Sequence, residues 1–529
     1  MIKLHYLLPG VALCGGAITS CQNKQVDQRP NILFIMSDDH ALSAISAYDG
    51  LLSSVAPTPN IDRIANEGML FNNFMVTNSI SGPSRACILT GKYSHVNGFY
   101  KNEDGGDFDP EQMTFPKLLQ ESGYQTAVIG KWHLGSSPTG FDHYEVLFNL
   151  EGQGSYHNPV FEVSGGDIIP EEGGYSTSVI RDKGLEWMAS RDKSKPFMLM
   201  YQFKAPHRPC NPSEEYMDYL KDVELPYPAT FEDDYKGRSL AQAAWNHIDG
   251  NMTRTDLKLP VPEGLSEEQE LAWREYGNAR GEDWTPDPKM SDEERKKWKY
   301  QSYVKDYLRC VKAVDDAIGE MLDYLDENGL AENTIVVYTS DQGFFLGEHG
   351  GWFDKRFIYE ETLHMPAMIR YPNGIKAGVV NDDLLLNIDY APTFLDYAGV
   401  EIPEEIQGKS IRPVLEQSQE GAFRDGIYYH YYEYPRWHNV QPHYGVRSER
   451  YKLIHFYYDV DIWELYDLES DPYEMNNVYG KKGYEEVTAL HKEMLEELKE
   501  EVKMDKSLDE LRAMTDAIIP RIYEKEPLE

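Results

Sequence analysis

The sequence is poor in positive charge. Its 529 residues include 51 Lys and Arg against 89 Asp and Glu, so the formal net charge is −38 at pH 7. Proteins that bind nucleic acid need clustered Lys and Arg to contact phosphates, and this balance excludes such a partner. An anionic ligand would have to be recognised by a local cluster of basic side chains, because long-range attraction cannot recruit it.

Cysteine and long apolar segments are also scarce. After Cys21 only Cys87, Cys210 and Cys310 remain, which is too few for a disulfide framework. No segment beyond the N-terminal region is long and apolar enough to span a bilayer. We therefore expect any membrane association to depend on a lipid anchor alone.

The N-terminus has the features of an export signal. Lys3 and His5 precede a short apolar run that extends to Ala17, as in secretory signal peptides. The next residues, 18–21 (ITSC), resemble a bacterial lipobox, so residues 1–20 are predicted to be removed and Cys21 to be lipidated; plain secretion is the alternative. Because no acidic cluster follows Cys21, we expect an exported outer-membrane lipoprotein that faces the periplasm.

Strand-like and helix-like patterns alternate over most of the chain. Buried-strand patterns cover 31–36, 126–129, 197–203 and 334–339, and helical patterns cover 61–67, 115–121 and 303–328. The alternation predicts an α/β fold with a largely parallel sheet. Each strand pattern is followed by polar residues, and ligands of open α/β sheets bind at these carboxyl ends.

The last part of the chain has a different pattern. From about residue 425, Tyr-rich alternating runs predict antiparallel strands, and an amphipathic helix is predicted near 483–503. We therefore predict a catalytic domain over 22–424 and a small C-terminal α+β subdomain over 425–529. Residues 230–300, rich in charge, Trp and Pro, are predicted to be an insertion over the sheet that lines the substrate mouth.

The most informative stretch is 81–91, SGPSRACILTG. Pro83 suits the first turn of a helix and Gly91 suits its end. Arg85 follows Ser81 by one turn, so both side chains can face one point at the helix N-terminus, where free N–H groups favour an anion. An ordinary Ser-capped helix is the alternative. The stretch matches every fixed position of the type I sulfatase pattern, Cys/Ser-x-Pro-Ser-Arg-x-x-x-Leu-Thr-Gly.

The resemblance to type I sulfatases covers nearly the whole mature chain. Other matching segments are NILFIMSDD at 31–39, GKWHLG at 130–135, KAPH at 204–207 and SDQG at 340–343. The resemblance implies an alkaline-phosphatase-like large domain, with a mostly parallel central sheet sandwiched by helices, and a small C-terminal α+β domain with an antiparallel sheet. It also implies that a radical maturation enzyme converts Ser81 to formylglycine (3-oxoalanine).

Two chemical groups of side chains follow the predicted strands and the Ser81 motif. Oxygen ligands are offered by Asp38, Asp39, Asp341 and Gln342. Such a set suits a hard cation, and Ca²⁺ tolerates irregular geometry better than Mg²⁺. Basic or proton-transferring groups are Arg85, Lys131, His133, His207 and Lys355. These suit an anion such as sulfate.

The resemblance implies a role for each of these residues. The four oxygen donors, with the residue made from Ser81, would bind one Ca²⁺; Arg85 would hold that residue; Lys131 and Lys355 would hold sulfate oxygens; His133 would assist turnover of the covalent intermediate; and His207 would protonate the leaving alkoxide. Gln342 departs from the commonest pattern, which has Asn or His at this position, although its amide oxygen can still reach a metal.

The stretch GEHGGWFDKRF at 347–357 resembles sulfatases that act on the 6-O-sulfate of N-acetylglucosamine. Asp354, Arg356 and His443 are predicted to bind the sugar, and His438 is a further candidate from the small domain. Alternatively, Asp354 and Arg356 pair with each other or with the second domain. The predicted function is exo-acting removal of this sulfate from a glycosaminoglycan or mucin-type glycan.

Three alternatives to this function are open. The first is a sulfatase of another position, such as iduronate 2-O-sulfate or a galactose or GalNAc sulfate. The second is a phosphate or phosphonate ester hydrolase of the same superfamily; enzymes of this type with two metals need further Asp and His ligands, whereas Lys131 and Lys355 stand in those places here. The third is an inactive glycan-binding lipoprotein, against which the intact set of residues argues.

Overall fold

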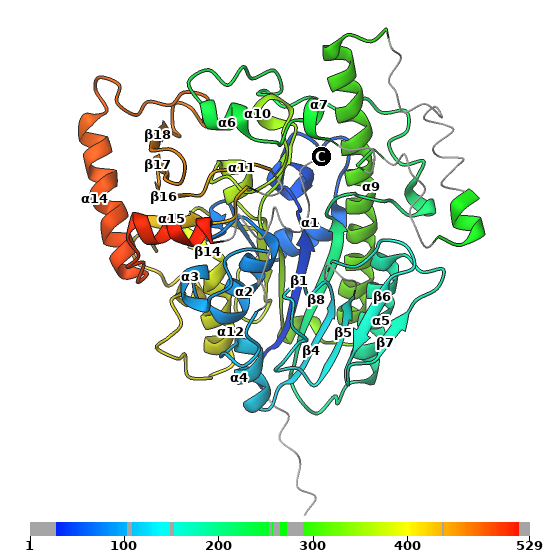
Figure 1. Cartoon of the computed structure of the whole chain (residues 1–529). Helices are drawn as coiled ribbons and strands as arrows, with labels where there is room; N and C mark the ends of the chain where they lie inside the picture. Colours follow the sequence, from blue (N-terminus) through cyan, green and yellow to red (C-terminus); the bar gives the residue numbers. More distant parts are fainter. Residues whose placement is uncertain are drawn as a thin grey trace, which may run out of the picture.

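The computed structural model describes residues 28–102, 108–148, 153–252, 256–257, 265–271, 289–435 and 438–517. The predicted signal peptide and Cys21 lie outside these residues. A ten-stranded sheet crosses the large domain, and a four-stranded sheet lies beside it (Figure 1). No helix in the described part of the chain is both long and apolar enough to cross a membrane.

The large sheet is mixed, and its centre is parallel. Its strands, in spatial order, are β13 (Val379–Asn381), β2 (Met69–Phe71), β12 (Ala367–Arg370), β9 (Thr334–Ser340), β1 (Asn31–Asp38), β8 (Phe197–Pro206), β4 (Gln125–Gly130), β5 (His143–Leu147), β6 (Val160–Val163) and β7 (Ile168–Pro170). β1 pairs in parallel with β8 and β9, and β4 pairs in parallel with β8 and β5. These pairings confirm the predicted α/β class.

Helices cover both faces of the sheet (Figure 1). One face carries α1 (Pro59–Asn66), α5 (Ser176–Ser190) and α9 (Asp292–Glu327), and the other carries α2 (Ser81–Thr90), α4 (Phe115–Glu121) and α12 (Tyr390–Tyr397). Ile32 and Phe34 of β1 enter one hydrophobic core, whereas Leu33 and Ile35 enter the other. Since both faces of β1 are buried, its residues 32–36 are apolar throughout rather than alternating.

The small domain contains the predicted antiparallel sheet. It consists of β15 (Gly426–Tyr431), β16 (His443–Ser448), β17 (Tyr451–Phe456) and β18 (Ile462–Asp467), with α14 (Glu485–Glu501) and α15 (Leu508–Asp516) packed nearby. The shorter elements are β3 (Phe74–Met75), β10 (Phe345–Leu346), β11 (Phe353–Asp354), β14 (Leu385–Leu386), α3 (Ser94–Asn97), α6 (Ser239–Ala243), α7 (Ile248–Asn251), α10 (Glu348–Gly351), α11 (Glu360–Leu363) and α13 (Arg412–Leu415).

The longest helix begins earlier than predicted. α9 starts at Asp292 rather than near residue 303, and Ser291 and Glu294 form a capping box at its start. Reciprocal bonding of this kind satisfies the free N–H groups of a first turn. The residues just after the cap are largely exposed. Their sequence therefore shows no apolar stripe, which is the pattern that predicts the rest of the helix. Only part of the predicted 230–300 insertion is described, including α6 and α7.

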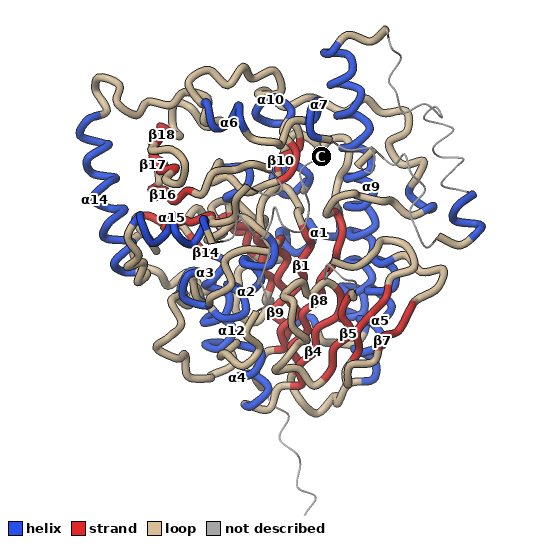
Figure 2. The backbone as a smooth tube through the Cα atoms, viewed as in Figure 1, coloured by secondary structure: helices blue, strands red, loops and turns tan. Residues whose placement is uncertain are grey.

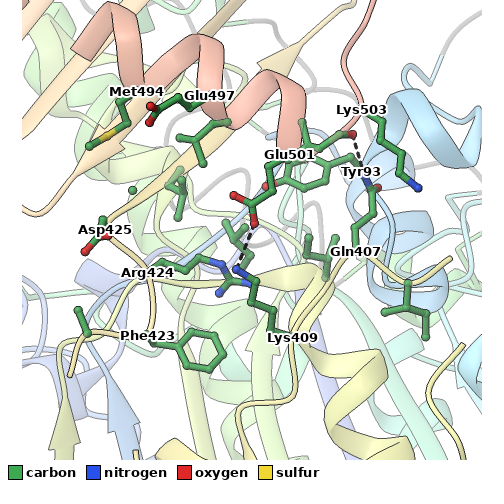
Figure 3. Close-up of a pocket in the computed structure, with 18 of the residues that line it drawn as sticks. Tyr93, Gln407, Lys409, Phe423, Arg424, Asp425, Met494, Glu497, Glu501 and Lys503 are labelled. Atoms are coloured by element: carbon green, nitrogen blue, oxygen red, sulfur yellow. Dashed lines mark hydrogen bonds and ion pairs between the residues drawn. The ribbon is translucent and has the colours of Figure 1, made fainter. Parts of the chain in front are cut away.

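A cavity of about 510 Å³ lies where α14 meets the loops of the large domain (Figure 3). Lys409 Nζ lies 3.1 Å from Glu501 at its edge, and Gln407 Nε2 donates to the carbonyl of Val502 at 2.7 Å. Its lining contains none of the predicted site residues. This cavity therefore belongs to the junction of the two domains and not to the chemistry.

Asp389, near this cavity, carries a buried charge within the large domain. Both of its oxygens accept from the Arg424 guanidinium at 2.6 Å, and it also accepts from the N–H groups of Leu386 and Lys409. Removing one partner of a buried ion pair leaves the other charge unpaired. We therefore expect Asp389→Ala to lower the free energy of unfolding by about 3–5 kcal/mol, measured by denaturant unfolding.

Lys409→Ala is the matched control for that measurement. Its ion pair with Glu501 is half exposed, and the loss of such a surface pair is expected to cost below about 1 kcal/mol. Similar small effects of both substitutions would show that the buried Asp389–Arg424 pair contributes no more to stability than an exposed one.

Candidate active site

Four neighbouring strands bring the predicted polar clusters to one edge of the sheet. β9, β1, β8 and β4 are consecutive in the sheet, and Figure 2 shows them side by side. Their carboxyl ends carry Asp341 and Gln342, Asp38 and Asp39, His207, and Lys131 and His133, respectively. Because the four strands are parallel, side chains far apart in sequence meet at this edge.

Helix α2 places Ser81 and Arg85 at the same edge. The helix is buried throughout and ends at Gly91, whose φ of 65° lies in the left-handed region that favours glycine. Ser81 Oγ donates to Asp38 Oδ1 at 3.2 Å and lies 3.2 Å from Lys355 Nζ. The predicted helix is confirmed, and Ser81 stands at its N-terminus between an acidic and a basic residue.

The two predicted lysines contact different carboxylates of the site. Lys131 Nζ contacts Asp38 and also donates to Gln153 Oε1 at 2.9 Å, whereas Lys355 Nζ contacts Asp39. Both lysines are almost fully buried, at 0% and 3% exposure. Buried cations of this kind are poorly hydrated and are available to an anion that enters the site.

Arg85 fixes the position of Asp341. Its Nε donates to Asp341 Oδ2 at 3.1 Å, and its Nη1 donates to the carbonyl of Lys131 at 2.8 Å and to Gln202 Oε1 at 2.9 Å. Burial favours a raised pKa for Asp341, but Arg85 and Lys355 outweigh it and hold that pKa below its usual value. Asp341 is therefore ionised.

The oxygen donors fit a hard cation. Asp39 Oδ2 and Gln342 Oε1 are buried and accept no hydrogen bond within the described residues. Asp38, Asp39 and His207 each place a ligand atom within 4.8 Å of the others. Burial raises the pKa of Asp39 to about 7 although Lys355 opposes the shift. A divalent cation would relieve the cost of burying these oxygens together.

The two predicted histidines both lie near the charge of Lys131. His207 Nε2 is 3.6 Å from Asp39 Oδ2, and its Nδ1 donates to the carbonyl of Arg208 at 2.6 Å. Burial and the charge of Lys131 hold the pKa of both His207 and His133 well below the usual value. A bound anion would offset the positive charge and raise these pKa values.

The loop that carries Lys355 has an unusual backbone. Asp354 and Arg356, on either side of the lysine, have φ values of 93° and 96°. The Asp354 carboxylate accepts from the N–H of Lys355 at 2.9 Å and from Arg208 Nη1 at 3.1 Å. It also lies 3.0 Å from His438 Nε2. These contacts hold a conformation that L-residues seldom adopt.

Asp354 and Arg356 pair with each other and with groups of the small domain, which is the arrangement that the sequence left open beside sugar binding. Arg356 Nη1 donates to Glu433 Oε1 at 2.7 Å and to Tyr431 Oη at 3.2 Å. Arg356 Nε is 3.8 Å from Asp354 Oδ1. Both side chains retain a few per cent of exposure, so they stand beside the site rather than outside it.

His443 is not placed to bind a sugar, and this part of the prediction is corrected. Its ring is fully buried, its Nδ1 donates to the carbonyl of Gln441 at 2.8 Å, and its Nε2 accepts from the N–H of Ile358 at 3.2 Å. Through this bond to Ile358 it supports the loop after Lys355. His438, through its contact with Asp354, is the histidine that the small domain brings to the site.

Sequence reasoning missed a second ion pair at the rim. The guanidinium of Arg208 binds both oxygens of Asp256, at 3.0 and 2.8 Å, in addition to Asp354. It also lies over the ring of Phe353, 4.8 Å from its centre. Arg208 directly follows His207 and could have been suspected, but nothing near Asp256 in the sequence signals its role.

Comparison with known proteins agrees with this geometry. Residues 30–400 match the profile of the sulfatase family, and residues 347–501 match that of the N-sulphoglucosamine sulphohydrolase C-terminal region. The chain is 47% identical over 517 residues to an N-acetylglucosamine-6-O-sulfatase of Bacteroides thetaiotaomicron, a match that covers 94% of this chain and 91% of that protein.

A solved structure and a mammalian protein are also similar to this chain. A solved structure, described as a complex with its substrate D-glucosamine-2-N,6-O-disulfate, is 47% identical with a TM-score of 0.86 and covers 91% of this chain and 99% of that one. An N-acetylglucosamine-6-sulfatase of Capra hircus is 24% identical and covers 88% of this chain and 82% of that protein.

Proposed function

Because the chain belongs to the sulfatase family, we propose that it removes the 6-O-sulfate of N-acetylglucosamine from a glycosaminoglycan or mucin-type glycan. It is a sulfuric ester hydrolase with the alkaline-phosphatase-like fold. The observation that carries the choice of substrate is the 47% identity, over nearly the full length, to a protein named for this reaction. The position of Asp354 and Arg356 beside Lys355 supports it.

Ser81 is proposed to be the precursor of the nucleophile. Formylglycine made from it would supply, in its hydrated form, a hydroxyl that attacks sulfur and a second one that allows sulfate to leave. Ser81 Oγ already lies 3.2 Å from both Asp38 Oδ1 and Lys355 Nζ. Asp38 thus orients the attacking group, while Lys355 stands where the sulfate oxygens would gather charge.

A Ca²⁺ ion is proposed at Asp38, Asp39, Asp341 and Gln342, together with residue 81. When bound, it would offset negative charge on the sulfate oxygens. Lys131 and Lys355 would hold the same oxygens from the other side, and Arg85 keeps Asp341 ionised. His207 is proposed to donate its proton to the sugar O6 as the S–O bond breaks, and His133 to assist the release of sulfate.

Substrate recognition and location are proposed from the remaining residues. Asp354, Arg356 and His438 are proposed to face the sugar hydroxyls around the scissile group, in an exo-acting pocket.

Export, lipidation of Cys21 and a periplasmic location are proposed from the signal and lipobox pattern of residues 1–21. A radical maturation enzyme that acts on Ser81 is the proposed protein partner.

A desulfation screen tests the proposed substrate. Matured enzyme is incubated with positional sulfate isomers of N-acetylglucosamine, N-acetylgalactosamine, galactose and a 2-O-sulfated uronic acid, and released sulfate is measured. We expect the 6-O-sulfate of N-acetylglucosamine to be preferred. Preference for another isomer would refute this substrate, and faster turnover of 4-nitrophenyl phosphate than of the sulfate esters would favour a phosphoester hydrolase.

The role of His207 predicts a dependence on the leaving group. His207→Ala is expected to slow release of sulfate from a sugar by about 10²–10⁴-fold, because an alkoxide leaves poorly without a proton. 4-Nitrophenyl sulfate, whose leaving group needs no proton, should be affected far less. Kinetic constants for both substrates measure this difference, and equal losses would assign His207 to another task.

A further inference from the structure

A short segment of the insertion is fastened to the loop that carries Lys355. The N–H of Phe353 donates to the carbonyl of Asn246 at 3.0 Å, and His247 forms a β-bridge with Trp352. Asn246 is fully buried and Ala244 nearly so. Residues 244–247 are therefore held against the catalytic loop by backbone contacts.

The same segment is also bonded to His438. The N–H of Trp245 donates to the carbonyl of His438 at 2.7 Å, and His438 Nδ1 donates to the carbonyl of Trp245 at 3.0 Å. His438 in turn lies 3.0 Å from Asp354. Trp245 is thus linked to the Asp354 carboxylate through His438 alone. These contacts fix the backbone of Trp245 relative to the site.

The side chain of Trp245 does not share in this packing. It is 44% exposed, although its two neighbours are buried. Its indole forms no hydrogen bond and no ring contact with any residue that the structure describes. A single exposed apolar side chain is ordinary on a protein surface. Trp245 differs because hydrogen bonds to His438 fix the backbone that carries it, and His438 contacts Asp354 beside Lys355.

The geometry points to Trp245 as a stacking platform for the sugar that is glycosidically linked to the sulfated one. This inference rests on the proposed function. The face of an indole packs against the C–H groups of a pyranose ring, and this contact does not depend on charge. An enzyme of net charge −38 that acts on an anionic glycan gains from such a contact, because it binds a neighbouring sugar without electrostatic attraction.

Trp245→Ala tests the platform with two substrates. Matured enzyme is assayed on the 6-O-sulfated N-acetylglucosamine monosaccharide and on a disaccharide that carries the same residue at its non-reducing end. We expect kcat/KM on the disaccharide to fall about fivefold to tenfold, mainly through KM, with little change on the monosaccharide. Trp245→Phe, which keeps an aromatic face, should recover most of the loss.

Leu271→Ala is the matched control, since Leu271 is another exposed apolar residue of the insertion, at 59% exposure. It should change neither substrate. An equal loss on both substrates for Trp245→Ala, or no loss, would overturn the platform. If the wild-type enzyme prefers a different sulfated sugar, the proposed substrate is wrong, and the same comparison with the monosaccharide and disaccharide of that sugar decides the role of Trp245 separately.

Discussion

Replacing Ser81 with alanine is expected to reduce sulfate release by at least about 10⁴-fold, because it removes the group from which the nucleophile is made. The fold should be retained. The side chain of Ser81 is short and lies at a helix N-terminus. Its hydroxyl can be removed without unpairing Asp38, which still contacts Lys131. Sulfate release from a sugar substrate and thermal unfolding, measured on the same preparation, separate the two effects.

The wild-type protein gives a second form of the same experiment. Produced in a host without the maturation enzyme, it should carry unmodified serine and be nearly inactive; produced with that enzyme, the peptide containing residue 81 should be lighter by two hydrogen atoms. Ser94→Ala, at a buried serine outside the site, should remain active when matured. Full activity with unmodified Ser81 would refute the formylglycine mechanism.

Removal of divalent cations is expected to have the second largest effect, a fall in activity of at least about a hundredfold. Stability should fall too. Asp38, Asp39 and Asp341 are completely buried close to one another. An ion that binds only the folded state adds about 2.7 kcal/mol to the free energy of unfolding when its concentration is a hundred times its dissociation constant. The thermal midpoint is therefore expected to drop with EGTA and to recover with Ca²⁺.

Two variants show whether this response comes from the proposed ligands. Asp341→Asn should weaken the stabilisation by Ca²⁺, whereas Asp256→Asn, which alters a carboxylate at the rim but outside the ligand set, should retain it. Recovery with Mg²⁺ but not with Ca²⁺ would correct the identity of the ion. A midpoint that is insensitive to chelators in both the wild type and Asp341→Asn would contradict a metal at this site.

The centre of the fold and most of the catalytic residues could be predicted because their signals are local. The apolar run of β1 predicts a buried strand, and Asp38 and Asp39 at its end predict where the polar pair lies. Adjacent parallel strands then bring such pairs together. Each step depends on residues a few positions apart, which a single sequence displays.

The rim of the site could not be predicted in the same way, because its contacts join residues far apart in the chain. Arg208 pairs with Asp256, and Arg356 pairs with Glu433, yet none of these carboxylates stands in a recognisable pattern. Nothing in the sequence separates His438, which lies beside Asp354, from His443, which does not. His443 packs its ring on Phe456 of the small domain and on Phe357 of the large domain, and this burial follows only from the way the small sheet packs.

The positive φ values on both sides of Lys355 have a consequence for binding. Two such residues cost about 1–3 kcal/mol each, and this free energy is spent when the protein folds rather than when a ligand arrives. The ammonium group is thereby preorganised, since little reorganisation remains to be done as sulfate enters. The fold is less stable by this amount, and the Lys355 ammonium group is already in its binding position before the substrate is present.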